Sequence, residues 1–316
     1  APAPEAEASV PEPVAAPVVE RDPSEVMGGA ERELGEHRFI LPADVEHAFM
    51  TDSFSFDQGF GALASKEKLE HPFTGDEFTL SAFVLRERIG AQAALFDRVA
   101  LDLRIDALVA VGGNVETAVL LAGIAQPDAS IGPKVRLLTV GPAQITGGVY
   151  YRYRKVLIVS PANAIQTAMD QGEFTTKGLV DEQNEKFADP LVAGAVGWGP
   201  IGLQLALKYG VSLDKKVAGN VMAVGTALSL DARNVTSKFP LALSFEYLLE
   251  TTQPSEDEKD AAEEADEKAE AADVKTITAG VFYSGRRDLQ LGMRYSKMLD
   301  PNFDFWFATL NLGYFF

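Results

Sequence analysis

The sequence contains no cysteine and only three histidines among its 316 residues. The absence of cysteine excludes disulfide frameworks, thiol catalysis and thiolate metal sites. His37 and His47 precede or begin the first predicted strand, and His71 falls in a predicted loop. A histidine-dependent hydrolysis needs that side chain beside its partner, and three scattered histidines offer little for it or for zinc. We therefore expect neither an enzyme nor a metal site.

The sequence also lacks any run of 18 or more apolar residues, which excludes a transmembrane helix. The motif GWGPIG at 197–202 has the spacing of a dinucleotide-binding loop. Such a loop must lead into a helix whose N-terminus receives the pyrophosphate, but the residues that follow alternate as in a strand. We expect a turn between strands at this motif, and no cofactor.

Positive charge is scarce, with 28 basic residues against 46 acidic ones and a formal net charge of −18. Residues 1–36 hold nine carboxylates and two arginines, and residues 256–273 hold ten carboxylates and two lysines. Nucleic acid is not an expected partner, because binding phosphates needs a basic surface. The Ala- and Pro-rich composition of 1–36 predicts a disordered acidic tail. The folded domain is predicted over 37–316, with an acidic exterior loop at 251–273.

From about residue 48 onward, apolar and polar residues alternate. In IGLQLALKYGVSL (201–213) every odd-numbered residue is apolar, and the residues between are Gly, Gln, Ala, Lys and Ser. Strict alternation predicts a strand with one apolar and one polar face. Twelve such strands are predicted, at 48–64, 76–95, 98–112, 131–140, 143–158, 189–199, 201–215, 217–231, 238–250, 274–285, 288–298 and 303–316.

The connections between these strands alternate between short and usually longer ones, as they do in a membrane barrel with two different sides. Large charged neighbours on the polar face, such as Arg152 and Arg154, need a watery space. Trp306 and Tyr314 are eight residues apart in the last strand, which spans about 20 Å of membrane height in a tilted strand. We predict an all-β fold, a transmembrane antiparallel up-and-down β-barrel of about twelve strands with its apolar face toward lipid.

The chain ends in FATLNLGYFF, with apolar residues at alternate positions up to an aromatic C-terminus. Through Leu310, Leu312, Tyr314 and Phe316 this end resembles the assembly signal of porin-like bacterial outer-membrane β-barrel proteins. The resemblance implies a location in the outer membrane of a Gram-negative envelope, contact with its lipid and lipopolysaccharide, and recognition of the last strand by the barrel assembly machinery. It also places the tail on the periplasmic side, where the tail, or else the loops, could bind other envelope proteins.

The polar face of the predicted strands would line the lumen. It carries nine cations against three carboxylates, a net charge of about +6, and Arg or Lys rings in a pore attract anions. Two functions stay open. The first is a channel for passive transport of small solutes, with an anion preference; the second is a plugged, non-conducting barrel that anchors other envelope proteins, its cations paired with loop carboxylates. The predicted pore-lining residues are Arg86, Arg88, Asp102, Arg104, Asp106, Lys134, Arg136, Arg152, Arg154, Lys208, Glu246 and Arg294.

Two further segments break the alternation. Residues 113–125 are more apolar than an exterior loop usually is, and residues 161–172 have the pattern of a short helix. Each could fold into the mouth of the barrel as a constriction or pack on neighbouring loops.

Overall fold

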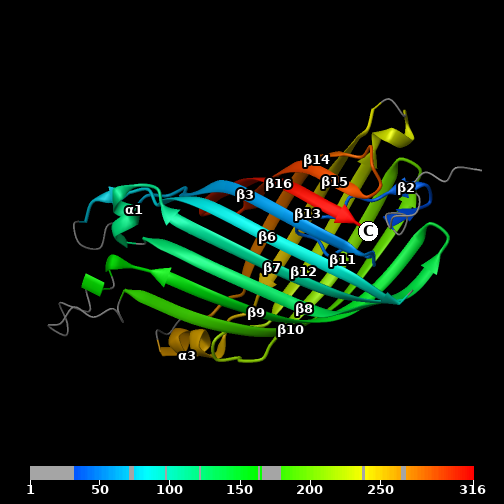
Figure 1. The fold of residues 1–316 in the computed structure, drawn as a ribbon. Coiled ribbons are helices and arrows are strands. Elements are labelled where there is room, and N and C mark those ends of the chain that lie inside the picture. Colours follow the sequence, from blue (N-terminus) through cyan, green and yellow to red (C-terminus); the bar gives the residue numbers. More distant parts are fainter. Residues whose placement is uncertain are drawn as a thin grey trace, which may run out of the picture.

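The structure, a computed structural model, describes residues 32–70, 75–96, 98–120, 122–162, 164–165, 179–236, 239–264 and 268–316. Twelve of its strands, each antiparallel to both neighbours, form a closed barrel in which the last strand pairs with the first (Figure 1). This confirms the predicted fold class. The barrel strands are β3 (Ser53–Ser65), β6 (Ser81–Phe96), β7 (Val99–Gly112), β8 (Gly123–Val140), β9 (Ala143–Val159), β10 (Val180–Trp198), β11 (Ile201–Ser212), β12 (Val221–Asp231), β13 (Leu241–Thr252), β14 (Ala272–Tyr283), β15 (Leu289–Leu299) and β16 (Phe303–Phe315).

The two ends of the barrel differ. One end, here called the turn end, carries the short connections between strands and the C-terminus (Figure 1). At GWGPIG the chain turns between β10 and β11 as predicted, with Gly199 at φ +52°, a conformation that glycine adopts without strain. The opposite end, called the loop end, carries the longer connections. The small sheet β4 (Leu69–Glu70) with β5 (Glu77–Phe78) lies in one of them.

Short helices lie outside the barrel wall. Helix α1 (Val115–Leu120) is tied to the loop end of β6, where Thr117 Oγ1 accepts a hydrogen bond from the backbone N–H of Ser81. The apolar segment 113–125 therefore packs on the rim, and its last residues begin β8. Helix α3 (Glu256–Glu264) belongs to the acidic loop, and η4 (Ala232–Asn234) to a turn. Most of 161–172 lies outside the described residues, as does His71. In the described part of the chain no helix is long and apolar enough to cross a bilayer.

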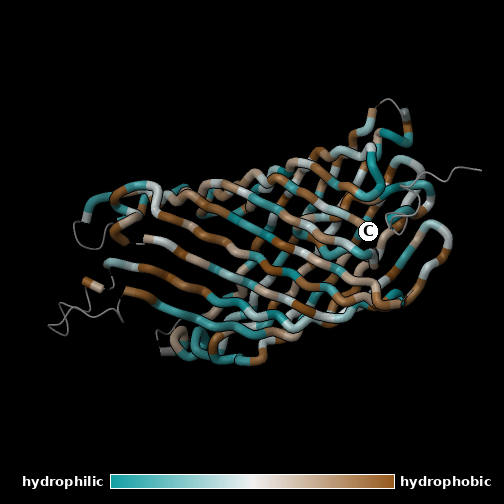
Figure 2. Tube along the Cα trace, in the orientation of Figure 1, coloured by the Kyte–Doolittle hydropathy of each residue, from teal (hydrophilic) through white to brown (hydrophobic). Residues whose placement is uncertain are grey.

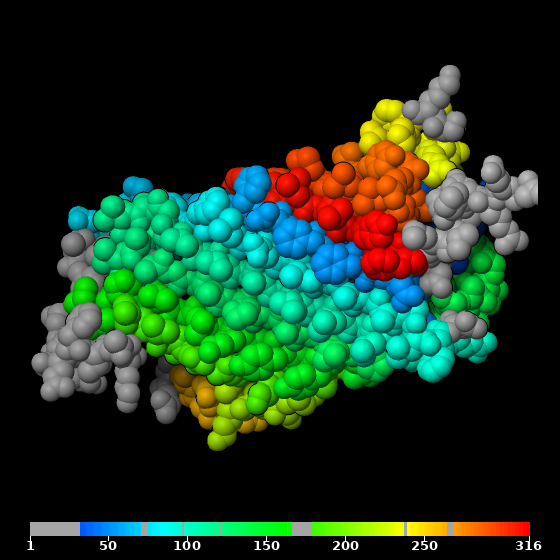
Figure 3. All heavy atoms as spheres, viewed as in Figure 1, coloured from blue at the N-terminus to red at the C-terminus, as the bar shows by residue number. Residues whose placement is uncertain are grey.

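The barrel is apolar outside and polar inside. Along each strand the hydropathy alternates (Figure 2). Leu203, Leu205 and Leu207 are 40–54% exposed on the outer face of β11, whereas Gln204 between them is 1% exposed. A continuous apolar surface of this size belongs against lipid. In Figure 3 the strands from β16 through β3 to β9 cover one side of the barrel as an unbroken surface.

The outer face of β3 and β6 carries polar side chains at mid-height. Leu310 lies midway between the aromatic side chains Trp306 and Tyr314 of β16, and it pairs in register with Gln58, which pairs with Glu87. Both polar side chains are exposed on the outer face. The aromatic residues mark the two interfaces of a membrane barrel. Glu87 therefore faces the middle of the apolar band.

Replacing this carboxylate should stabilise the barrel. We expect Glu87→Leu to raise the free energy of unfolding in lipid by about 1–2 kcal/mol, because a carboxylate at the midplane costs less than the 2–4 kcal/mol of a basic side chain but is still unfavourable. Urea unfolding in liposomes measures the difference. The control is Glu67→Leu in an exposed loop, with an expected change near zero. A lower free energy of unfolding for Glu87→Leu would mean instead that another molecule in the membrane binds the Glu87 carboxylate.

Residues 32–52, here called the luminal segment, enter the barrel from the turn end and fold back to it. The guanidinium of Arg38 donates to the backbone oxygens of Ser284 and Arg286 in the turn between β14 and β15. At the other end of the segment the backbone oxygen of Asp52 accepts a hydrogen bond from the N–H of Phe316. The segment includes the small sheet β1 (Glu33–Leu34) with β2 (His37–Arg38).

The sequence explains why this segment lies inside. Phe39, Val45 and Phe49 are 0–3% exposed and pack on small inward-facing side chains of β10, β11 and β12, notably Ala193 and Ala206. Small wall residues leave space that aromatic and branched side chains of the segment fill. Each Å² of apolar surface buried in this way stabilises the packing by roughly 25 cal/mol.

Several sequence-based placements near this segment were wrong. The first barrel strand begins at residue 53 rather than 48, and His37 and His47 lie inside the barrel instead of before it. The Nε2 atom of His37 is 2.7 Å from Ser229 Oγ. Residues 32–36 of the predicted tail belong to the luminal segment, and the rest of that tail lies outside the described residues. The segment lacks the strand alternation because it contacts wall on all sides.

Candidate functional site

The lumen holds every side chain that the sequence analysis placed there. All twelve lie on the inward parity of their strands, alternating with the exposed outer residues. Nine of them line one cavity of about 430 Å³, which residues 41–47 of the luminal segment also line. The other three, Lys134, Arg136 and Glu246, lie outside that lining. The nine are Arg86, Arg88, Asp102, Arg104, Asp106, Arg152, Arg154, Lys208 and Arg294.

The predicted excess of positive charge in the lumen was wrong. The wall contributes further carboxylates: the predicted strands 131–140 and 189–199 began too late to include Asp128 and Glu185, and the inward parity of Asp57, Asp189 and Glu250 was overlooked. Asp44 and Glu46 of the luminal segment add two more. Around the cavity and its ion pairs, nine wall cations therefore face ten carboxylates, while Arg32, Glu33, Arg38 and Asp231 lie nearer the turn end, outside this set. The carboxylates are Asp44, Glu46, Asp57, Asp102, Asp106, Asp128, Glu185, Asp189, Glu246 and Glu250.

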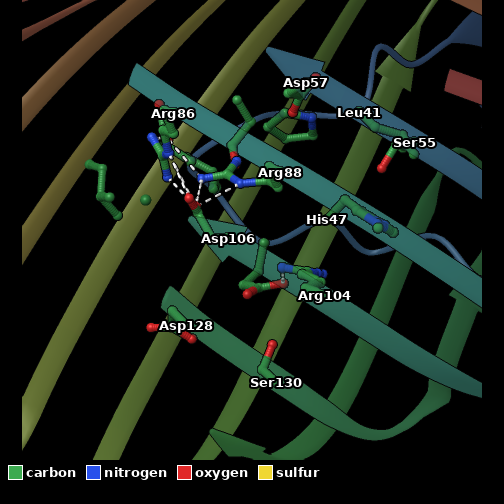
Figure 4. A pocket seen from close by; sticks show the side chains of 18 of the residues that line it. Leu41, His47, Ser55, Asp57, Arg86, Arg88, Arg104, Asp106, Asp128 and Ser130 are labelled. Carbon is green, nitrogen blue, oxygen red and sulfur yellow. Dashed lines mark hydrogen bonds and ion pairs between the residues drawn. The ribbon is translucent and has the colours of Figure 1, made fainter. Parts of the chain in front are cut away.

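The first ionic cluster joins the tip of the luminal segment, residues 43 and 44, to β6 and β7. Arg86 Nη2 lies 2.6 Å and Arg88 Nη2 3.0 Å from Asp106 Oδ2. Both guanidiniums also reach Asp44 Oδ1 of the segment, at 3.4 Å and 3.6 Å. In Figure 4 the side chains of Arg86, Arg88 and Asp106 converge beside the segment. Arg88 further donates to the backbone oxygen of Ala43. Two cations thus share one wall carboxylate and one segment carboxylate.

The second cluster repeats this arrangement closer to the turn end. Arg104 Nη1 is 2.6 Å from Glu46 Oε2 of the segment, and its Nη2 is 3.0 Å from Asp102 Oδ2 of the wall. Lys134, which has no exposed surface, places Nζ 3.5 Å from the same Asp102 oxygen and 3.1 Å from the backbone oxygen of His47. Here too, two cations share one wall and one segment carboxylate.

The third cluster belongs to the wall alone. Arg152 Nε lies 2.9 Å from Asp189 Oδ2, and Arg154 lies 3.4 Å from Asp128 and 3.5 Å from Glu185. The guanidinium carbons of Arg152 and Arg154 lie 4.4 Å and 5.6 Å from the centre of the Phe187 ring, which supports both as cation–π partners. This cluster holds β8, β9 and β10 together without the luminal segment.

Glu246 on β13 anchors the tip of the segment from the opposite wall. Its carboxylate, 1% exposed, accepts hydrogen bonds from the backbone N–H groups of Ala43 and Asp44 at 3.0–3.1 Å. Arg294 beside it donates from Nη2 to the backbone oxygen of Leu41 at 2.6 Å and lies 3.8 Å from Glu246. Hydrogen bonds in which one partner is charged are stronger than those between neutral groups. Glu246 and Arg294 therefore hold the tip of the segment against this wall.

The last strand contacts the exit of the segment at the turn end. Phe315 N–H donates to the backbone oxygen of Asp288, and Tyr314 and Phe316 place their ring centres 5.1 Å apart. In the same turn Arg286 hydrogen-bonds Asp288 and lowers the pKa of its carboxyl below the usual value. Asp288 is therefore ionised at neutral pH. Of the assembly-signal residues, Leu310, Leu312 and Phe316 are 42–54% exposed.

The described residues contain no group of three or more acidic or histidine side chains placed to hold a metal ion. No family model matches the chain, and no curated protein matches it.

Solved structures do resemble the fold. An outer-membrane channel from Pseudomonas putida F1 is 11% identical, with a TM-score of 0.53, and the match covers 88% of this chain and 100% of that one. The translocator domain of autotransporter NalP from Neisseria meningitidis is 11% identical, with a TM-score of 0.48, over 86% and 90% of the two chains. The NanC porin is 7% identical, with a TM-score of 0.45, over 82% and 100%. At such identity the likeness to the first of these concerns the fold alone, and it agrees with the predicted closed β-barrel.

Proposed function

We propose that this protein is a passive channel for small polar solutes across the bacterial outer membrane, and that the luminal segment closes it in the conformation described. The observation that carries the proposal is the cavity of about 430 Å³, which is lined by ionic side chains of the wall and by residues 41–47 of the luminal segment. Its volume suits a small solute. A barrel that served only as an anchor would have no need of a charged cavity.

The way the segment is held supports its role as a gate. From Phe39 to Asp52 it forms no strand and so belongs to no backbone ladder of the wall. Apart from the backbone hydrogen bond between Phe316 and Asp52, side-chain hydrogen bonds, ion pairs and apolar contacts hold it to the wall. Such contacts can be exchanged for water one at a time, whereas a strand built into the barrel could leave only by opening the wall.

The anion preference predicted from the sequence would apply to the open channel. With the segment in place the lumen is nearly neutral. When the segment withdraws, it takes Asp44 and Glu46 with it, and around the cavity nine wall cations then face eight wall carboxylates. We propose a weak anion preference on this basis, since cationic rings attract anions.

Conductance tests the proposal. The full chain, reconstituted in a planar bilayer under a potassium chloride gradient, should show discrete current steps with a reversal potential of the anion sign. A heat-denatured sample is the control. Complete silence at every voltage, from protein shown to be inserted, would favour the second function, the non-conducting anchor.

The expected partners complete the proposal. We propose that the exposed Leu310, Leu312 and Phe316, with Tyr314, form the signal that the barrel assembly machinery reads, and that the turn end faces the periplasm. The apolar outer face would contact lipid, and the loop end lipopolysaccharide. The tail or the loops remain the proposed contacts to other envelope proteins.

A further inference from the structure

We propose that Arg86, Arg88 and Arg104 form a binding site for solutes with one or two carboxylates, and that Asp44 and Glu46 of the luminal segment occupy this site when the channel is closed. The proposal rests on the proposed channel function and names its solute class and the way in which that solute competes with the gate.

The charges of the two segment-contacting clusters carry the first step. In the wall alone, Arg86 and Arg88 share the single carboxylate of Asp106. Arg104 and Lys134 likewise share Asp102. Each wall cluster therefore has one unbalanced positive charge, and the segment supplies one carboxylate to each.

The third cluster shows that this imbalance is specific. Arg152 and Arg154 face three wall carboxylates, at Asp128, Glu185 and Asp189, and no segment carboxylate. The segment brings a carboxylate to each of the two clusters in which wall cations outnumber wall carboxylates. It brings none to the third cluster, where three wall carboxylates face two cations. The two unbalanced clusters are thus built to receive anionic groups from inside the lumen.

The geometry of contact matches carboxylate recognition. Asp44 Oδ1 lies between two guanidinium groups at 3.4 Å and 3.6 Å, and Glu46 Oε2 lies 2.6 Å from a third. The planar donor fork of arginine suits carboxylates better than a point charge does. Asp44 and Glu46 are two residues apart at the bend of the segment, and the arginines that they contact lie on the neighbouring strands β6 and β7. A solute with one carboxylate can therefore replace either group, and a dicarboxylate is the probe for both.

The site can be reached from the cavity. Arg86, Arg88 and Arg104 all line it (Figure 4). Asp44 and Glu46 line it as well. A solute carboxylate that enters from the loop end meets the same guanidiniums that the segment contacts. Binding of the solute and seating of the segment are then mutually exclusive, and each weakens the other by the same factor.

The test is isothermal titration calorimetry with succinate on the full chain in detergent micelles. We expect Asp44→Asn/Glu46→Gln to bind succinate at least tenfold more tightly than the native chain, because the amides keep the shape but leave both clusters unbalanced. Asp44→Asn alone should fall between the two. Neutral succinamide should bind to none of them. Circular dichroism and thermal unfolding establish that each variant is folded.

A matched pair of arginine variants separates the site from general electrostatics. In the Asp44→Asn/Glu46→Gln background, Arg88→Gln should abolish measurable binding, whereas Arg154→Gln, which removes the same charge from the same lumen, should change the affinity by less than twofold. Equal losses in both would overturn the proposal. So would an Asp44→Asn/Glu46→Gln variant that is folded but binds succinate no more tightly than the native chain.

Calorimetry reads binding without requiring conduction. A chain that binds succinate as expected but never conducts would refute the channel and keep the site. A chain that conducts but whose folded variants show no gain in succinate binding would keep the channel and refute the site.

Discussion

The variant Val45→Cys/Gly225→Cys should carry no current while its disulfide is intact and should conduct after reduction. Val45 is the buried apolar residue near the deepest point of the luminal segment, and Gly225 faces it from β12. A Cβ atom placed on Gly225 would lie 3.2 Å from the Cβ of Val45, just below the 3.5–4.5 Å usual for a disulfide. Replacing Val45 with cysteine also removes the methyl groups that would otherwise collide with it. Because the chain contains no other cysteine, this is the sole disulfide that a single chain can form.

The expected effect is large because the bond is covalent. If the segment is the gate, the oxidised variant should fall at least about 100-fold in open time relative to the same protein in dithiothreitol, since opening would require a break in the disulfide. The single variant Val45→Cys should behave alike under both conditions. An oxidised double variant that conducts as well as its reduced form would show that solute passes without movement of the segment, and the gating role would be lost.

The strands were predictable because a membrane barrel imposes one simple rule. Each wall residue faces either lipid or lumen, so the sequence alternates, as in 201–213, and all twelve predicted strands occur in the structure. Their ends were less predictable. Strand β10 begins at Val180 rather than 189, since its first residues project beyond the apolar band and are exposed and polar on both faces. Alternation has no physical basis there.

The contents of the lumen were not predictable by the same rule. The luminal segment contacts several strands at once, so it has neither a lipid face nor a period. One signal was present: residues 39–41 and 48–50 are two short apolar stretches without alternation, shortly before the first strand. A second was the computed excess of inward positive charge. Buried cations need partners, so a net charge of about +6 implied carboxylates that the strand assignment had not yet found.

Glu246→Leu should release the tip of the segment and hold the channel open. Its carboxylate accepts the backbone N–H groups of Ala43 and Asp44. Hydrogen bonds to a charged acceptor contribute about 1.5–3 kcal/mol each. Loss of both should weaken the closed state by about 3 kcal/mol, which is roughly a 100-fold change in the ratio of closed to open channels. Single-channel recording measures this ratio directly.

The control for this variant lies on the same strand. Glu250→Leu removes an inward carboxylate that also lines the cavity, four residues further along β13, and among the described residues it has no hydrogen bond to the luminal segment. It should leave the ratio of closed to open channels unchanged within about twofold. Glu246→Gln, which keeps one acceptor oxygen, should be intermediate. If Glu250→Leu opened the channel as much as Glu246→Leu, opening would follow from the net charge of the lumen, and the two backbone hydrogen bonds at the tip would have no special part in closure.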